Sequence, residues 1–108
     1  MAEDVQQLFA GVRDFGWDPK KRESNLRKHS LDFEDATGIF YGPVVVRQSN
    51  RNNEGRWIAI GSLDDRLITV VFTRRADVIR IISARRARKN EEREYRTAEM
   101  GRSPEGQD

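Results

Sequence analysis

The sequence contains no cysteine and only one histidine among its 108 residues. The lack of cysteine excludes disulfides, thiolate metal sites and a Cys nucleophile, and a single histidine excludes a metal site built from several imidazoles. No apolar run approaches the ~20 residues that a membrane-spanning helix needs, and the acidic, Gln-containing start is unlike a signal peptide. We therefore expect one small cytoplasmic domain without membrane association.

Arginine dominates the charged residues. Charged residues make up 35% of the sequence, yet the net charge is only +2, and arginine supplies 16 of the 20 cations. Residues 74–96 hold nine cations and four acids, a net charge of +5. Such polarised charge is typical of a surface that binds polyanions. A solvated face with internal ion pairs has the same composition, so both interpretations stay open.

Apolar spacing and turn residues indicate the order of the elements. Residues 1–14 have the spacing of a short helix or an ordered arm, and residues 15–17 are typical of a brief strand. Asp18 and Asp32 are good N-caps, so helices are expected at residues 20–29 and 33–40. Four β-branched runs predict strands at residues 44–47, 56–61, 67–74 and 78–85. A charged helix is expected over residues 86–100.

These elements predict an α+β fold. A small antiparallel sheet would pack against two N-terminal helices and one C-terminal helix, and its near-continuous apolar strands would be covered in part on both faces. We assign residues 15–96 to the domain, residues 1–14 to an N-terminal extension or short helix, and residues 97–108 to a disordered tail.

Arg80 interrupts the apolar strand at residues 78–85. A charged group in a central strand is costly to desolvate unless it is paired or lines a cleft. It is expected either to form an ion pair with an acid such as Asp77, Asp18 or Glu34, or to contact a phosphate. Alternation of a regular strand predicts two faces, one with Val78, Arg80, Ile82, Ala84 and Arg86, and the other with Ile79, Ile81, Ser83 and Arg85.

His29 falls at the end of the first predicted helix, directly after Lys28. A histidine there can bond to the last carbonyl groups and interact favourably with the helix dipole. It can also act as a general acid or base, because its ordinary pKa is near 6.5. Asn25, one helical turn earlier, could face the same cleft.

The residue types available suit one reaction. RNA can be cleaved by its own 2′-hydroxyl, which yields a cyclic phosphate and requires no covalent nucleophile, metal or cofactor. The protein needs only to assist a proton transfer, hold the in-line geometry and stabilise charge on the phosphorane, which Arg and Lys can do electrostatically.

The chain resembles the BrnT toxin family from about Phe15 to Tyr95. Its first half carries the family-like segments FGWDPK at residues 15–20, NLRKH at 25–29 and FEDA at 33–36. Its second half carries EGRWIAIG at residues 54–61, RL at 66–67, VVFT at 70–73, IRIISARRA at 79–87 and ER at 92–93. Two departures stand out, Gly16 where the family usually has Glu and Ser30 where Gly is common.

The resemblance implies the toxin of a bacterial type II toxin–antitoxin module, with a fold similar to RelE-type ribonucleases. Such a toxin cleaves RNA and halts translation. A BrnA-like ribbon-helix-helix antitoxin neutralises it, and the complex reaches operator DNA through that antitoxin. The catalytic candidates are Lys28, His29, Arg80 and Ser83. The candidate RNA- and phosphate-binding residues are Arg74, Arg75, Arg85, Arg86 and Arg88.

Two other functions use the same sequence features. A non-catalytic module of this fold would bind nucleic acid in a salt-dependent way and leave RNA intact. A purely structural protein would use its arginines to dock an acidic partner and would show no affinity for RNA.

Overall fold

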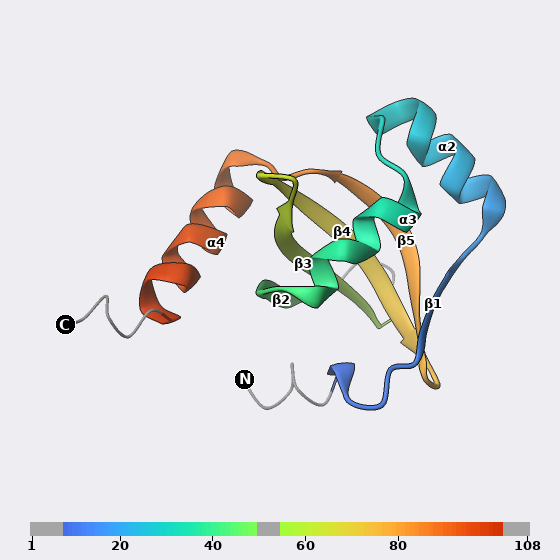
Figure 1. The fold of residues 1–108 in the computed structure, drawn as a ribbon, viewed down its shortest axis with the longest axis horizontal. Coiled ribbons are helices and arrows are strands. Elements are labelled where there is room, and N and C mark those ends of the chain that lie inside the picture. The colour runs from blue at the N-terminus through green and yellow to red at the C-terminus, as the bar shows by residue number, and fades with distance from the viewer. Residues whose placement is uncertain (1–7, 50–54, 103–108) are drawn as a thin grey trace.

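A five-stranded sheet in the order β1-β5-β4-β3-β2 forms the centre of the protein (Figure 1). The computed structural model describes residues 8–49 and 55–102. The strands are β1 (Asp14–Trp17), β2 (Val44–Ser49), β3 (Arg56–Leu63), β4 (Arg66–Arg75) and β5 (Val78–Arg86). The helices are α2 (Pro19–His29), α3 (Phe33–Ala36), the 3-10 helix η1 (Thr37–Tyr41) and α4 (Lys89–Arg102). Figure 1 shows α2 and α4 at opposite ends of the molecule.

The sheet is mixed, whereas the sequence predicts a purely antiparallel one. Strands β2 to β5 pair in antiparallel succession and confirm the predicted meander. The brief strand β1 instead runs parallel to β5, with Phe15 opposite Ile79 and Trp17 opposite Ile81. The chain leaves this edge through α2, α3 and η1, enters the sheet again at the far edge with β2, and returns strand by strand until β5 lies beside β1.

Both N-terminal helices begin where the sequence predicts. The Asp18 side chain accepts a hydrogen bond from the Lys20 amide at 2.8 Å, and the Asp32 side chain accepts one from the Glu34 amide at 3.3 Å. These bonds satisfy amide groups that have no partner inside the helix. The second helix differs from the prediction, because it is helical only over α3 and then tightens into η1.

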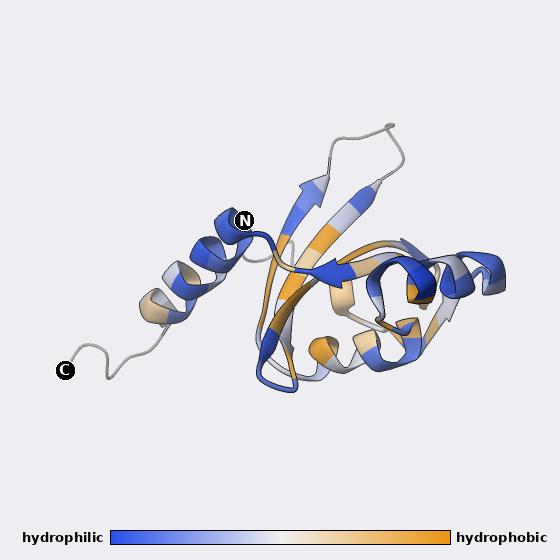
Figure 2. Ribbon diagram, turned by 90° about the horizontal axis from the view of Figure 1, so that it is seen from above, coloured by the Kyte–Doolittle hydropathy of each residue, from blue (hydrophilic) through white to orange (hydrophobic). Residues whose placement is uncertain are grey.

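The core lies between α3, η1 and one face of the sheet. Phe33, Ala36 and Ile39 are buried against apolar side chains of β3, β4 and β5. Gly61 lets η1 approach the sheet closely, because a Cβ there would lie 2.8 Å from the Cβ of Ile39. Figure 2 shows the apolar residues concentrated in the strands and α3, while α2 and α4 are largely hydrophilic.

The opposite face of the sheet is covered in part by α4. This helix lies against β2 and β3, and the Thr69 hydroxyl donates to Glu91 Oε1 at 2.9 Å. Thr69 and Ile60 are fully buried although they point away from the main core. The central strands are therefore covered at least in part on both faces, as expected from their apolar runs.

A β-bulge interrupts the pairing of β4 with β5. Phe72 lies opposite Ile81, but the preceding residue of β4, Val71, lies opposite Ser83. Ile82 is therefore an extra residue on β5, and the alternation of side chains changes phase at this point.

The bulge places the functional candidates of β5 on one face. Regular alternation predicts that Arg80 and Ala84 share a face, but Ala84 is fully buried in the core together with Ile81. Arg80 instead lies on the face of Ser83 and Arg85. The predicted grouping of Arg80 with Ala84 and Arg86 is wrong because the sequence gives no local signal for the extra residue.

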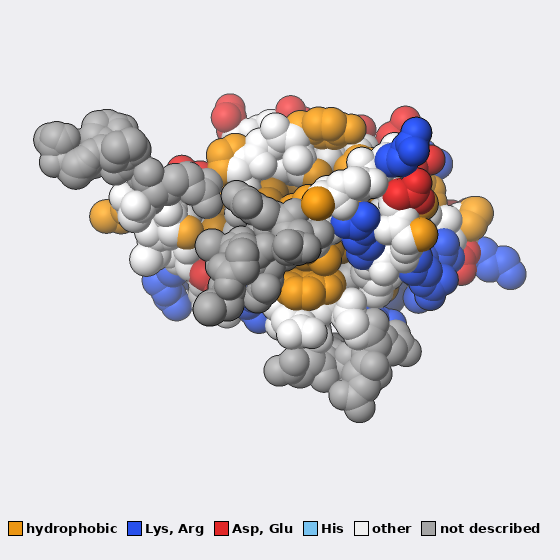
Figure 3. All heavy atoms as spheres, turned by 90° about the horizontal axis from the view of Figure 1, so that it is seen from below, with side chains coloured by type: hydrophobic (Ala, Val, Ile, Leu, Met, Phe, Trp, Pro, Cys, Tyr) orange, Lys and Arg blue, Asp and Glu red, His pale blue; other side chains and the backbone are white. Residues whose placement is uncertain are grey.

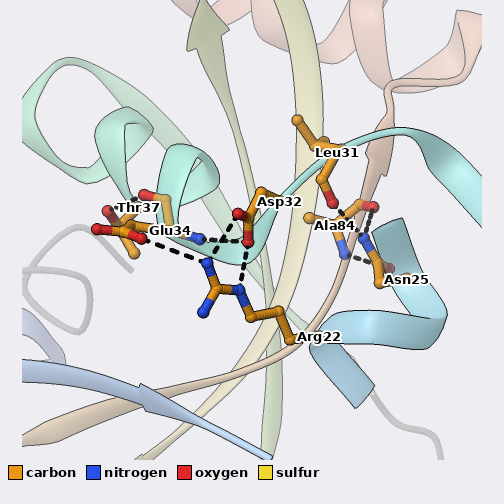
Figure 4. A network of polar contacts seen from close by, with 7 residues as sticks. All are labelled: Arg22, Asn25, Leu31, Asp32, Glu34, Thr37 and Ala84. Carbon is orange, nitrogen blue, oxygen red and sulfur yellow. Dashed lines mark hydrogen bonds and ion pairs between the residues drawn. The ribbon is translucent and has the colours of Figure 1, made fainter. Parts of the chain in front are cut away.

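Asn25 joins α2 to the edge of β5. Its side-chain amide donates to the Ala84 carbonyl at 2.8 Å and to the Leu31 carbonyl at 3.0 Å, and its oxygen accepts from the Ala84 amide at 3.1 Å (Figure 4). The residue is buried. β1 pairs with β5 only as far as Trp17. Beyond that point, the Asn25 side chain forms the hydrogen bonds with the Ala84 backbone that a neighbouring strand would otherwise form. Contrary to the sequence expectation, Asn25 is not among the residues that line the hollow of His29.

Arg22 joins α2 to the start of α3. It forms two parallel hydrogen bonds with Asp32, at 2.7 Å from Nε and 2.9 Å from Nη2 (Figure 4). Its guanidinium also lies over the ring of Trp17. The hydrogen bond from Arg22 lowers the pKa of the Asp32 carboxyl below its ordinary value. Together with Asn25, this pair fixes α2 against the sheet.

The two ends of the domain extend beyond the expected boundaries. Phe9 stacks on Phe72 with ring centroids 5.9 Å apart and meets the edge of Phe40 at 5.7 Å, so the end of the predicted extension contributes to the core. The rest of that extension, residues 1–7, lies outside the described residues. α4 continues through residues 97–102, which were assigned to the tail, and residues 103–108 are also outside the description.

Candidate nucleic-acid interface

Two adjoining hollows lie on the face of the sheet opposite the main core. The first, of about 640 Å³, we call the Arg80 hollow; it is lined by Asp18, Lys21, Gly55, Arg56, Thr73, Arg74, Arg75, Arg80, Ile81 and Ile82. The second, of about 550 Å³, we call the Arg85 hollow; it is lined by Arg47, Gln48, Ser49, Arg56, Ile58, Val71, Ile82, Ser83, Arg85, Arg88 and Glu91. Arg56 and Ile82 belong to both, so the two hollows adjoin, and we call them together the groove.

Arg80 is half-buried and has no hydrogen bond or ion pair with any residue that the structure describes. The ion pair with Asp77, Asp18 or Glu34 that the sequence allows is absent within residues 8–49 and 55–102; Glu34 instead pairs with Arg22. A partly desolvated guanidinium without a carboxylate is costly on its own. Its position favours the other interpretation, in which an external anion completes the site.

The surroundings of Arg80 are strongly cationic. Within residues 8–49 and 55–102, its hollow is lined by one carboxylate and by the further cations Lys21, Arg56, Arg74 and Arg75. Figure 3 shows Lys and Arg side chains gathered at the end of the molecule that carries α2. Like charges this close repel one another, and a phosphodiester would relieve the repulsion.

Arg74 is held rigidly at the rim of this hollow. Its Nε donates to the Ala76 carbonyl and its Nη1 to the Leu8 carbonyl, both at 2.7 Å. Arg75 lies next to it and is exposed. The segment before β1 therefore positions one of the predicted phosphate-binding residues.

In the Arg85 hollow, a buried carboxylate holds Arg85. Arg85 Nη1 and Nη2 donate to Glu91 Oε1 and Oε2, each at 2.9 Å. Glu91 is 2% exposed and also accepts from the Arg88 amide at 2.8 Å and from Thr69. These hydrogen bonds outweigh the effect of burial and lower the pKa of Glu91 to about 2.

Ser83 and Arg88 line the same hollow as Arg85. Ser83 is half-buried and Arg88 is exposed at the start of α4. The structure thus brings together six of the nine predicted site residues in one groove: Arg74, Arg75, Arg80, Ser83, Arg85 and Arg88.

His29 and Arg86 lie in a separate hollow of about 480 Å³. It is formed where the end of α2 meets the β3–β4 turn, and it includes Arg66 together with the acids Asp35 and Asp64. His29 is exposed, as is Lys28 beside it. The predicted proton-transfer residues and Arg80 are therefore not brought into a common hollow.

Sequence reasoning missed several residues of the groove. Asp18 was interpreted as a helix cap and as one possible ion-pair partner of Arg80, and Lys21, Arg47 and Arg56 were not singled out although they line it. Glu91 was counted only among the acids of the basic segment. Its place three residues after Arg88 is a usable signal, because a Glu at this position often caps a helix start.

Two features are absent from the described parts of the chain. No helix there is long and apolar enough to cross a membrane. Within the same residues, no group of three or more His, Asp and Glu side chains is arranged to hold a metal ion.

The fold and the groove define a class: a small α+β domain with arginines gathered on one face of its sheet. The sequence profile of a family described as the ribonuclease toxin BrnT of type II toxin–antitoxin systems matches residues 17–91. The chain belongs to this BrnT family. The family description implies an antitoxin partner and an RNA target, and it supports the resemblance seen in the sequence.

A solved structure agrees with this assignment. The crystal structure of the Brucella abortus ribonuclease toxin BrnT is similar to this chain with a TM-score of 0.62 and 30% sequence identity. The similarity covers 72% of this chain and 100% of that one. No curated protein matches the sequence. Phe9 and most of α4 lie outside the range that the family profile matches.

Proposed function

We propose that this protein is an endoribonuclease that cleaves RNA through the 2′-hydroxyl without a metal ion or other cofactor. The observation that carries the proposal is Arg80, a half-buried cation with no partner among residues 8–49 and 55–102, in a groove lined by further cations. A scissile phosphate at Arg80 would gain an extra negative charge in the transition state. Preorganised guanidinium groups stabilise such charge electrostatically.

The remaining site residues are given roles by their position. Arg85 would stabilise the phosphate from the second half of the groove, with Ser83 beside it. Arg74, Arg75 and Arg88 would bind neighbouring phosphates of the strand. Lys28, His29 and Arg86 would contact RNA outside the groove, because His29 and Arg86 line a different hollow from Arg80.

In the cell, this activity would make the protein a cytoplasmic toxin that inhibits translation. We propose that a BrnA-like ribbon-helix-helix antitoxin neutralises it and that the complex reaches operator DNA only through that antitoxin. The family membership and the likeness to a BrnT structure support this role. We also propose that the fold is RelE-like, with the cleavage site on the sheet face opposite the main core.

The test is cleavage of RNA by the purified chain in EDTA. Arg80→Ala should lose roughly 100- to 1000-fold in rate, by analogy with the removal of one oxyanion-hole donor. Arg27→Ala is the matched control, because Arg27 is exposed on α2 and paired only with Glu23. It should leave the rate unchanged. Circular dichroism of all three proteins confirms that they are folded.

Each alternative predicts a different result. Cleavage that disappears in EDTA contradicts the metal-independent mechanism. Intact RNA together with salt-sensitive binding would show a non-catalytic nucleic-acid-binding module. Equal activity of Arg80→Ala and the wild type would show that the scissile phosphate lies elsewhere.

A further inference from the structure

The proposed cleavage requires a group that accepts the proton of the 2′-hydroxyl. His29, which the sequence favours for this role, lines a different hollow from Arg80. Glu91 is buried and its two oxygens are occupied by Arg85, Arg88 and Thr69. We propose that Asp18 is the catalytic base. This inference rests on the proposed ribonuclease function and names a residue of its site.

The chain path places Asp18 in the hollow that Arg80 lines. Gly16 of β1 lies directly opposite Arg80 of β5 in the parallel pairing. Side chains alternate along a strand, so Asp18 projects to the same side as Gly16, whereas Trp17 packs on the core. Gly16 has no side chain, so no side chain of β1 lies between Asp18 and Arg80. Both line the same hollow.

The Asp18 side chain is held in place while one of its oxygens stays available. Oδ1 accepts the hydrogen bond from the Lys20 amide, and this N-cap fixes the carboxylate at the start of α2. Oδ2 makes no hydrogen bond with any described residue. A carboxylate oxygen within reach of the substrate hydroxyl is a suitable group for general-base catalysis. Among the residues that the structure describes, Asp18 is the one carboxylate that lines the Arg80 hollow.

The chemistry balances with solvent as the only other reactant. The Asp18 carboxylate takes the proton from the 2′-hydroxyl as the 2′-oxygen forms a bond to phosphorus. The bond from phosphorus to the 5′-oxygen breaks, and that oxygen takes a proton from water. The products are a 2′,3′-cyclic phosphate end and a 5′-hydroxyl end. Asp18 then returns its proton to the solvent, while Arg80 stabilises the charge on phosphorus throughout.

Asp18→Asn and Asp18→Ser separate catalysis from helix capping. Asn and Ser cap helices about as well as Asp, so both variants should fold and melt like the wild type. Neither can act as the base, so kcat should fall by about 100-fold or more, the usual contribution of a general base. KM should stay level or fall, because a negative charge has left a groove that binds a polyanion. A residue with only a structural role would not produce this split.

Glu23→Gln is the matched control for charge. Glu23 also lies on α2, is exposed and pairs only with Arg27. The variant should keep the wild-type kcat, while any general effect of added positive charge on RNA binding should appear in it as well.

The outcomes distinguish this inference from the proposed function. If Asp18→Asn and Asp18→Ser keep the wild-type kcat while Arg80→Ala loses it, the assignment of Asp18 is overturned and the ribonuclease function stands. An increase in KM at unchanged kcat also overturns the assignment. If the wild type leaves RNA intact, the proposed function itself fails. Loss of kcat in both folded variants, with KM level or lower, establishes Asp18 as the base.

Discussion

Arg85 and Glu91 are joined by two parallel hydrogen bonds of 2.9 Å, and this pair links the last strand of the sheet to the start of α4. The same carboxylate also accepts from the Arg88 amide and the Thr69 hydroxyl. It therefore caps the helix, satisfies a buried hydroxyl and orients an arginine of the groove. Five predictions follow from this pair and from other features of the structure.

Glu91 should make the stability of the protein depend on acid pH. The pKa of its carboxyl is lowered from 4.5 to about 2 in the folded state. A lowered pKa stabilises the fold fully above pH 4.5, and this contribution is lost as the pH falls from 4.5 toward 2. The contribution at neutral pH is on the order of 3 kcal/mol. Urea unfolding of the wild type between pH 7 and pH 3 would show the loss.

Glu91→Gln should remove that part of the pH dependence and lower the free energy of unfolding at pH 7 by about 3 kcal/mol, since it leaves Arg85 without its charge partner. Glu94→Gln is the control on the same helix. Glu94 pairs with Arg47 at a more exposed site, where loss of an ion pair costs less than about 1 kcal/mol. An unchanged acid dependence in Glu91→Gln would contradict the assignment.

Asn25→Ala should destabilise the fold more than any other change of a polar residue on α2. It removes three hydrogen bonds and leaves the amide and carbonyl of Ala84 without their partner. The expected loss is about 2 to 3 kcal/mol in urea unfolding at pH 7. Arg27→Ala provides the comparison at an exposed site on the same helix, and equal losses in the two variants would show that the Asn25 contacts contribute little.

Phe9→Ala should reduce stability by about 2 kcal/mol, because Phe9 packs on two rings of the core but is only half-buried. Tyr41→Ala is a suitable aromatic control, since Tyr41 is 81% exposed. Thermal melting of both variants checks the prediction. If Phe9→Ala has the same melting temperature as the wild type, the segment before β1 does not contribute to the stability of the core.

His29→Ala and Arg80→Ala should have different effects on the rate of RNA cleavage. Because His29 lines another hollow, its loss should leave kcat close to that of the wild type, with any effect in KM. Arg80→Ala should lose roughly 100- to 1000-fold in kcat. Initial rates over a range of RNA concentrations measure both constants. A comparable loss of kcat in the two variants would show that they act at one phosphate.

Much of the fold follows from local sequence. The aspartates before α2 and α3, the strand-forming runs of β2 to β5 and the short turns between the last three strands are all visible as patterns a few residues long. The place of β1 is not, because a four-residue strand does not specify which partner it joins or in which direction. Its parallel pairing depends on the route through α2, α3 and η1.

The candidate site, like the fold, was predicted from the sequence only in part. The wealth of arginine and the basic stretch from β4 to α4 indicated phosphate binding from composition alone, and Arg80 was singled out because it interrupts an apolar strand. The bulge at Ile82 then decides that Arg80 and Arg85 share a face, and packing decides that His29 does not join them. The sequence offered Asp18 as one of three possible partners of Arg80, and the pairing of β1 with β5 is what brings it into the same hollow.

By itself the sequence determined the helix starts, the strands of the meander and the cationic character of the protein, because these depend on neighbouring residues and on counts. Only the tertiary structure decided which charges meet. Register, bulges and strand direction are set by contacts between residues far apart in the chain, such as Asn25 with Ala84. A shift of one residue moves a side chain to the other face of a sheet, so the groove exists only in the assembled fold.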